Sequence, residues 1–366
     1  MFLTIHAIDK ASKKMGTRIE VYAGTAGHSA WFSDDMGETW IHPNSHSGMY
    51  LEARVWTFCS HPKTPDELYA GTDMGLFRWS EKTVRWTPVA SPMHDIWALA
   101  QDPDDPRILY AGTRPAGFFR SDDAGASWHE LNVPGISTFS EINMGATRVT
   151  QILIEPGDAH VIWATVEIGG IYRSDDGGRN WARRDDGLIS ADVHGIACIR
   201  NASGKPVLLA TTKRGLHRSD DEGRTWVFQE LDSPWQYTRT IVPRADSDAT
   251  LFLTNGDGPP GSTGILWRST DYGETWKNAG LPPGLNSTPW CVATHPSNPE
   301  IIFLASNLGQ IYRSTDGGDT WLRLPHEFGE VRSFCWRPID VAPDRPAHSI
   351  TIRPPAGNPP AQPTRI

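Results

Sequence analysis

Four arginines occupy comparable places in the chain, each at or near the start of a short apolar run. They are Arg54, Arg148, Arg239 and Arg332. A guanidinium group binds carboxylate, sulfate or phosphate through two parallel hydrogen bonds, so arginines that converge form a trap for an anionic ligand. The alternative is that they pair with nearby carboxylates and only hold neighbouring strands together. The candidate carboxylates for such pairing are Glu52, Asp95, Glu167 and Glu330.

Groups that could transfer a proton occur near the same runs. The candidates are Asp73, Asp95, Glu167, His194 and Tyr237. Carboxyl, imidazole and phenol groups are common general acids and bases, and an aromatic side chain such as Trp290 can stack on a sugar or anchor a contact. The combination predicts a hydrolase or lyase that acts on an anionic or carbohydrate-like small molecule. The competing interpretation is a non-catalytic module that presents the same groups to a protein or ligand.

Histidines supply a third interpretation, a metal-dependent enzyme. His28, His94 and His194 fall near the same loops and strand starts, and imidazoles with a carboxylate such as Asp95 suit zinc, iron or copper. No metal-binding spacing supports the set. We therefore predict no cofactor and keep a divalent metal on these histidines as an alternative.

The elements that position these residues are indicated by a repeat of the form Ser-x-Asp-x-Gly-x-x-Trp. Its copies run over residues 33–40, 121–128, 174–181, 219–226, 269–276 and 314–321, and an eroded copy over 80–86 keeps only the Ser and the Trp. In such a turn the Asp side chain accepts backbone N–H groups and the Gly adopts a conformation that other residues avoid. The Trp is expected to return into the core.

The repeats predict a single all-β domain. The seven Trp positions recur every 40 to 50 residues or so, and each interval holds four short apolar runs, which is typical of a propeller blade. We therefore expect a seven-bladed β-propeller with four-stranded antiparallel blades over residues 1–350, and a Pro-rich tail over 351–366. Extra residues in 132–145 and 256–264 indicate loop insertions. The strand from Glu330, rather than the one from Phe2, is expected to close the ring.

The repeat resembles the Asp-box, or BNR repeat, of a β-propeller superfamily. That superfamily includes sialidases, xyloglucan-cleaving glycoside hydrolases, sortilin-type receptors and photosystem II assembly factors, and the resemblance spans roughly residues 18 to 338. It implies that a ligand site lies on the face without Asp-boxes. The stretch from Leu68 to Trp79 is similar to a xyloglucanase segment that contains a catalytic carboxylate. In this chain Asp73 occupies the position of that carboxylate. The arginines and Tyr237 imitate a sialidase site in part, but the Phe/Tyr-Arg-Ile-Pro start is missing.

The composition limits the classes of partner that can be expected. The formal net charge is −9 and no long Lys/Arg run occurs, which argues against nucleic acid or an anionic membrane as a partner and leaves a protein partner open. We find no signal peptide pattern and no apolar run of membrane-spanning length, so the chain is predicted to be cytoplasmic. Four cysteines lie in apolar runs and are expected to be buried free thiols. They are Cys59, Cys198, Cys291 and Cys335.

Overall fold

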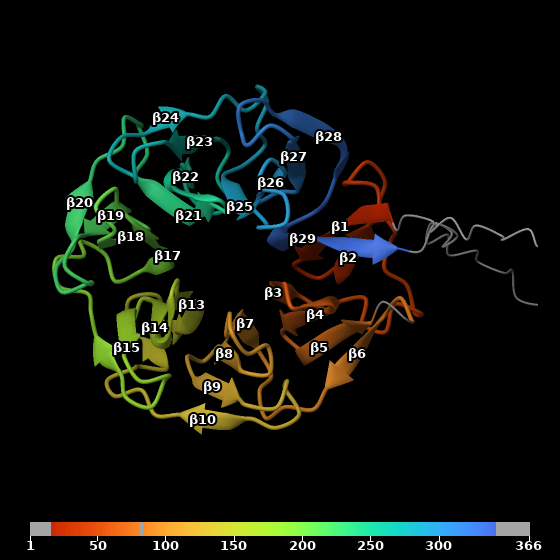
Figure 1. Ribbon diagram of the computed structural model, residues 1–366, viewed down its shortest axis with the longest axis horizontal. Coiled ribbons are helices and arrows are strands. Elements are labelled where there is room, and N and C mark those ends of the chain that lie inside the picture. The colour runs from red at the N-terminus through yellow and green to blue at the C-terminus, as the bar shows by residue number, and fades with distance from the viewer. Residues whose placement is uncertain (1–15, 81–82, 342–366) are drawn as a thin grey trace, which may run out of the picture.

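Seven antiparallel sheets follow one another around a central axis in the order of the chain (Figure 1). The computed structural model describes residues 16–80 and 83–341, and within them every regular element is a β-strand. In each sheet one strand faces the axis and the others lie progressively further out. The predicted seven-bladed propeller is therefore confirmed.

The blades are built from consecutive strands, innermost first, except that the first blade takes its inner strand from the far end of the chain. Blade 1 contains β29 (Val331–Val341), β1 (Gly16–Thr25) and β2 (Ala30–Ser33). Blades 2 and 3 contain β3 (Val55–His61), β4 (Thr64–Thr72), β5 (Gly75–Ser80) and β6 (Arg85–Val89), then β7 (Ile96–Gln101), β8 (Leu109–Thr113), β9 (Phe118–Ser121) and β10 (His129–Leu131).

The remaining four blades keep the same order. Blades 4 and 5 contain β13 (Arg148–Glu155), β14 (Asp158–Glu167), β15 (Gly170–Ser174) and β16 (Ala182–Arg183), then β17 (Val193–Arg200), β18 (Pro206–Thr212), β19 (Gly215–Ser219) and β20 (Val227–Gln229). Blades 6 and 7 contain β21 (Tyr237–Arg244), β22 (Ser247–Gly256), β23 (Gly264–Ser269) and β24 (Lys277–Asn278), then β25 (Pro289–Ala293), β26 (Ile302–Ser306), β27 (Gln310–Ser314) and β28 (Leu322–Glu327).

Ring closure follows the predicted route. β29 pairs with β1 along its whole length, from Gly16 opposite Val341 to Thr25 opposite Val331. Blade 1 differs from the four-stranded expectation, because its outer edge is a single bridge between Phe32 and Ile41 instead of a full strand. The proposed competitor from Phe2 and the Pro-rich tail lie outside the described residues.

A buried ion pair reinforces this closure. The Arg337 guanidinium on β29 donates to the Glu20 carboxylate at 3.2 Å and to the Tyr22 hydroxyl at 2.9 Å, both on β1. It also donates to the Pro65 carbonyl of blade 2 at 2.6 Å. The side chains of Arg337 and Glu20 are 2% and 0% exposed, so the C-terminal strand is attached to two blades through a dry polar contact.

The repeated turns connect the third and fourth strands, as expected. In the copy at Ser174–Trp181, the backbone N–H of Gly178 donates to Ser174 Oγ at 2.8 Å, and that of Asn180 donates to Asp176 Oδ1 at 2.8 Å. Gly178 has a φ of 90°, in the left-handed region that favours glycine. The Trp181 indole N–H donates to the Gly178 carbonyl at 2.9 Å, and the ring is buried.

The core is distributed between blades rather than collected at one centre. A representative cluster joins Ala98 and Tyr110 of blade 3 to Val149 and Ile162 of blade 4. The cysteines are free thiols, as predicted, and burial raises the pKa of Cys59, Cys198 and Cys291 to about 12. No helix in the described part of the chain is long and apolar enough to span a membrane.

The first insertion is more regular than a plain loop. Between blades 3 and 4 it forms a two-stranded hairpin from β11 (Phe139–Ser140) and β12 (Gly145–Ala146). The expectation of a loop without strands was therefore wrong at this place. The hairpin matters because its tip, Ile142 and Asn143, reaches the cavity described below.

Candidate active site

Every inner strand of the ring has a break in its pairing register near its first residues. At this break one or two residues have no partner on the second strand, as in a β-bulge, which turns a side chain to a new direction. The skipped residues are Arg332, Trp56, Trp97, Thr150, His194, Arg239 with Thr240, and Trp290. All of them line one cavity of about 200 Å³ among the inner strands. The seven bulges thus direct a ring of aromatic, cationic and hydroxyl side chains toward the axis.

One side of this ring is a stack of flat groups. The rings of Trp56 and Trp97 lie parallel with centroids 4.0 Å apart, and the Arg148 guanidinium lies 4.1 Å from the Trp97 ring. Both indole N–H groups donate to Asp95 Oδ1, at 2.7 Å and 3.0 Å. Burial raises the pKa of Asp95, although these hydrogen bonds oppose the rise. Asp95 therefore aligns the stack through the two indole groups.

The other side is organised around Trp290. The guanidinium groups of Arg239 and Arg332 lie 4.4 Å and 5.2 Å from its ring centroid. The Trp290 side chain belongs to β25 and the residue is only 3% exposed. Trp290 lines both cavities, so its role in substrate binding stays a prediction, and its ring also lies against the two arginines.

A larger cavity of about 730 Å³ contains most of the predicted site residues. It is lined by Arg148, Glu167, Asp192, His194, Lys213, Tyr237, Arg239, Trp290 and Arg332, together with Ile142 and Asn143 of the hairpin and Pro259 of the second insertion. Both insertions thus contribute to the wall. Five candidate residues from three consecutive blades meet here with Trp290 and Arg332 of blades 7 and 1.

The arginines divide into paired and unpaired groups. Arg148 forms an ion pair with Glu167, and Arg332 forms one with Glu330, as the pairing alternative predicted. Burial lowers the pKa of both arginines, and so does the neighbouring Arg239, while the carboxylates oppose this. Within residues 16–80 and 83–341, no ion pair involves Arg239. Among Arg148, Arg239 and Arg332, only Arg239 is therefore without a contacting carboxylate, and Lys213 and Arg214 also bring positive charge to the lining without an ion pair in these ranges.

His194 and Asp192 form a pair at the wall of the cavity. His194 Nε2 lies 3.3 Å from Asp192 Oδ1, and Nδ1 lies 2.6 Å from the Thr238 carbonyl oxygen. Both partners are acceptors, so this arrangement is satisfied when both ring nitrogens carry a proton. The pKa of Asp192 is lowered, because the contacts from His194, Lys213 and Arg239 outweigh the opposing effect of burial.

Tyr237 completes this group. Its ring lies 4.9 Å from the His194 ring, and burial raises the pKa of its hydroxyl while the nearby Arg239 opposes the rise. The phenol therefore keeps its proton at neutral pH. His194 and Tyr237 are thus candidate proton donors, and the carboxylates of Glu167 and Asp192 are candidate acceptors.

Five predicted residues lie outside the lining of both cavities, namely Arg54, Asp73, Asp95, His28 and His94. Arg54 is exposed and is absent from the cavity lining, and its backbone N–H donates to Asp73 Oδ1 at 2.9 Å, so Asp73 closes a turn. His28 and His94 are exposed. In the described ranges, no group of three or more His, Cys, Asp or Glu side chains is arranged to hold a metal ion, so the predicted histidine site is not formed there.

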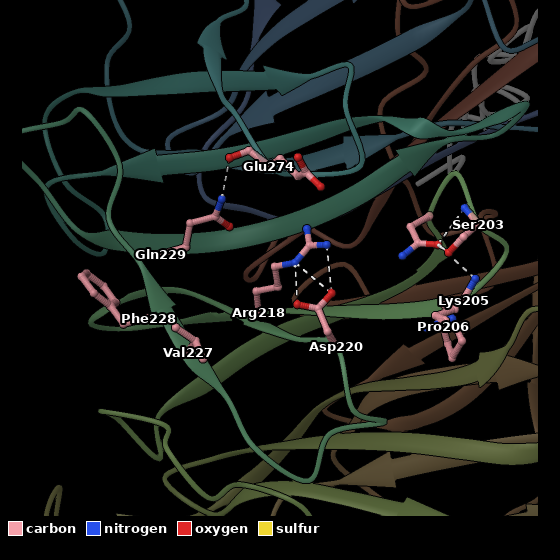
Figure 2. Close-up of a pocket in the computed structure, with 10 residues that line it drawn as sticks. Ser203, Lys205, Pro206, Arg218, Asp220, Val227, Phe228, Gln229 and Glu274 are labelled. Atoms are coloured by element: carbon pink, nitrogen blue, oxygen red, sulfur yellow. Dashed lines mark hydrogen bonds and ion pairs between the residues drawn. The ribbon is translucent and has the colours of Figure 1, made fainter.

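A second hollow of about 720 Å³ lies on the outside of blades 5 and 6 (Figure 2). Arg218 is already paired here, since it donates to both oxygens of Asp220 and to the Tyr272 carbonyl. The Gln229 amide likewise donates to the Glu274 carbonyl at 3.0 Å. None of the predicted site residues lines this hollow, so the axial cavity is the better candidate.

Comparison with known proteins identifies relatives of the chain. No family model matches it. Among curated proteins, it is similar to a xyloglucanase of Hypocrea jecorina, with 25% identity over 264 residues that cover 60% of this chain and 31% of that protein. It is also similar to a xyloglucanase of Paenibacillus sp., with 26% identity over 257 residues that cover 58% of this chain and 24% of that protein. The chain thus spans about a third or less of the length of these relatives.

Solved structures give a likeness over more of the chain. A GH74 enzyme of Niastella koreensis aligns with a TM-score of 0.58 at 22% identity, over 74% of this chain and 45% of that one. YCF48 from Cyanidioschyzon merolae aligns with a TM-score of 0.51 at 16% identity, over 77% and 87%. The shared feature is the propeller fold. At this identity the likeness concerns architecture, so the chemistry of this propeller must be argued from its own cavity.

The sequence missed two features of the propeller's cavity. Asp192 precedes the inner strand of blade 5 by one residue, and a carboxylate two positions before His194 is the signal that could have revealed it. The stacked pair of Trp56 and Trp97 was also missed, because strict alternation along a strand does not predict bulged residues.

Proposed function

We propose that this propeller is a hydrolase or lyase that acts on an anionic or carbohydrate-like small molecule bound in the axial cavity. The observation that carries the proposal is the convergence of Arg239, the Asp192–His194 pair and Tyr237 in one cavity of about 730 Å³. Pockets of about 300–1,000 Å³ with a few converging polar groups are typical ligand sites. The sequence likeness to xyloglucanases supports a carbohydrate as the substrate.

The roles follow from charge and protonation. Arg239 binds the substrate, because its charge is free to meet an anionic or strongly polar group. His194 or Tyr237 donates a proton to the leaving oxygen, and Glu167 accepts a proton from water or from a sugar carbon. Proton transfer by positioned side chains accelerates such reactions by about 10²- to 10⁴-fold per group. In hydrolysis the activated water attacks the anomeric carbon as its bond to the leaving oxygen breaks. In elimination the base removes the C5 proton next to a sugar carboxylate, the C4–O bond breaks and a C4=C5 double bond forms.

Product analysis tests this proposal. The purified protein is incubated with neutral xyloglucan oligosaccharides and with uronate-containing oligosaccharides, and products are separated by chromatography and mass spectrometry. Hydrolysis adds water to the products, whereas elimination gives an unsaturated sugar of lower mass. Asp192→Asn and Glu167→Gln should each reduce turnover about 100-fold. Asp246→Asn, which changes a carboxylate outside the cavity lining, should leave turnover unchanged.

A binding module is the second candidate. The β11–β12 hairpin exposes Phe139, Ile142 and Met144 beside the cavity, with exposed fractions of 50%, 83% and 76%. Exposed apolar side chains of this kind suit a protein contact, and a solved YCF48 structure that aligns with a TM-score of 0.50 is described as bound to D1 peptide. This alternative predicts no turnover with any oligosaccharide, so the same assay separates the two functions.

A further inference from the structure

We propose that the axial cavity selects a sugar acid over its neutral counterpart, and that Arg239 binds the carboxylate group. The inference deepens the proposed function and rests on it for the sugar part of the ligand. It rests on three observations: an unmatched charge, a fixed guanidinium plane and an apolar part of the wall.

Of Arg148, Arg239 and Arg332, Arg239 is the arginine without an ion-pair partner in the described residues. Arg148 and Arg332 are engaged by Glu167 and Glu330. Within residues 16–80 and 83–341, Arg239 has no such partner, although it lies close enough to both arginines to repel them. An anion that binds Arg239 relieves this repulsion. Lys213 and Arg214 line the same cavity without an ion-pair partner in these ranges, so the wall around Arg239 has an excess of positive charge that favours an anionic ligand.

The Arg239 guanidinium is also held in a defined plane. Its strand is bulged at Arg239 and Thr240, and the Thr240 hydroxyl donates to the Trp290 carbonyl at 2.6 Å, which ties β21 to β25. The guanidinium then lies against the Trp290 ring, 4.4 Å from its centroid. A stacked guanidinium leaves its N–H edge free for two parallel hydrogen bonds to a carboxylate. Because the group is already ordered, binding loses little conformational entropy.

The cavity wall distinguishes a sugar acid from a small inorganic anion. Ile142 of the hairpin and Ile189 of the loop before blade 5 line the same cavity, and they are 83% and 49% exposed. Sulfate or phosphate would leave these side chains in water. A pyranose ring has an apolar C–H face that covers them, which adds hydrophobic stabilisation to the ionic contact.

Binding of matched sugars tests the proposal. The probes are a glucuronate-containing and a galacturonate-containing disaccharide, the neutral counterpart of each, and inorganic sulfate, measured by calorimetry on the full chain. We expect at least one acid to bind about tenfold or more tightly than its neutral counterpart and than sulfate. Equal affinity for the acids and their neutral counterparts would overturn the proposal, and this comparison needs no variant.

Variants then identify the residue. Arg239→Gln should weaken binding of the acid about 10- to 100-fold and leave the neutral sugar unaffected. The matched control is Arg244→Gln on the same strand, since Arg244 donates to Asp246 at 2.7 Å and does not line the cavity. Equal weakening in both variants would show that only the general charge of the protein matters and would overturn the role of Arg239.

The readout separates this inference from the proposed activity. Acid-selective binding without turnover would support the carboxylate site and contradict the proposed enzymatic activity. Turnover of neutral sugars with no preference for acids would support the enzymatic activity and overturn the carboxylate site. Sulfate binding as tight as that of both acids would show an anion site without sugar selectivity and would also overturn the inference.

Discussion

Glu167 and Asp192 lie opposite each other in an isolated antiparallel bridge that joins the end of β14 to the start of blade 5. Each carboxylate has its own basic partner, since Glu167 forms an ion pair with Arg148 and Asp192 Oδ1 lies 3.3 Å from His194 Nε2. Two acidic residues can be neighbours in a half-buried wall only when such partners offset their repulsion. The bridge therefore couples the stability of the site to both ion pairs.

Arg148 and Arg239 should respond differently to replacement by alanine. Arg148→Ala removes the partner of Glu167 and the group above Trp97, so we expect a loss of about 1–3 kcal/mol in unfolding free energy. Arg239→Ala removes no ion pair and should change stability by less than about 1 kcal/mol. Denaturant melts of the two variants check this. An equal and large loss in both would mean that Arg239 is a structural residue.

Acid stability should depend on Asp192. Its folded-state pKa lies below the ordinary value, so its contribution to stability is present above the pKa of the unfolded chain, about 4, and is lost as the pH falls through the folded value. In Asp192→Asn the decline in stability below about pH 4 should be shallower than in the unchanged protein. Melting temperatures measured down to pH 2.5 on both proteins provide the test. Identical slopes would contradict the assignment.

The buried pair of Arg337 and Glu20 should be essential to the closed ring. Arg337→Ala leaves the Glu20 carboxylate in a dry environment, and we expect a loss of about 3–5 kcal/mol. Arg244→Ala is the matched control, because its pair with Asp246 is partly exposed and should contribute less than about 1 kcal/mol. Similar melting temperatures for the two variants would show that this contact does not hold β29.

Trp181 tests the packing of the repeated turns. Trp181→Ala removes a buried ring that lies 5.3 Å from Phe118 and donates to Gly178, and should cost about 3–5 kcal/mol in unfolding free energy. The exposed Val227→Ala is expected to be neutral within about 0.5 kcal/mol. Equilibrium unfolding in urea measures both. A marginal effect at Trp181 would reject the packing role of this ring.

The fold was predictable because the same turn recurs along the chain. Each copy marks the end of the third strand of a blade and the start of the fourth. Closure by the strand from Glu330 was predictable for a related reason, since its pattern matched the inner strand that begins near Arg54. The outer edge of blade 1 was not, because one bridge at Ile41 replaces a strand there.

The site was predictable only in outline. The convergence of Arg148, Arg239 and Arg332 followed from their equivalent places on inner strands. The bulges could not be predicted from the sequence. A residue skipped in the pairing depends on two strands together and leaves no periodic signal in either one. For that reason the burial of Trp290 was not predicted, and Arg54 was expected in a place that the bulged Trp56 takes instead.

The pairing of β29 with β1 has a consequence for how the protein is made. The first blade leaves the ribosome as β1 and β2 alone, and its inner edge stays uncovered until some 300 more residues have been synthesised. Six later blades can assemble in order meanwhile, but the circle is completed only after translation has reached the last strand. A nascent chain stalled before Val331 would therefore present an open sheet edge, the kind of surface that chaperones recognise and that drives aggregation.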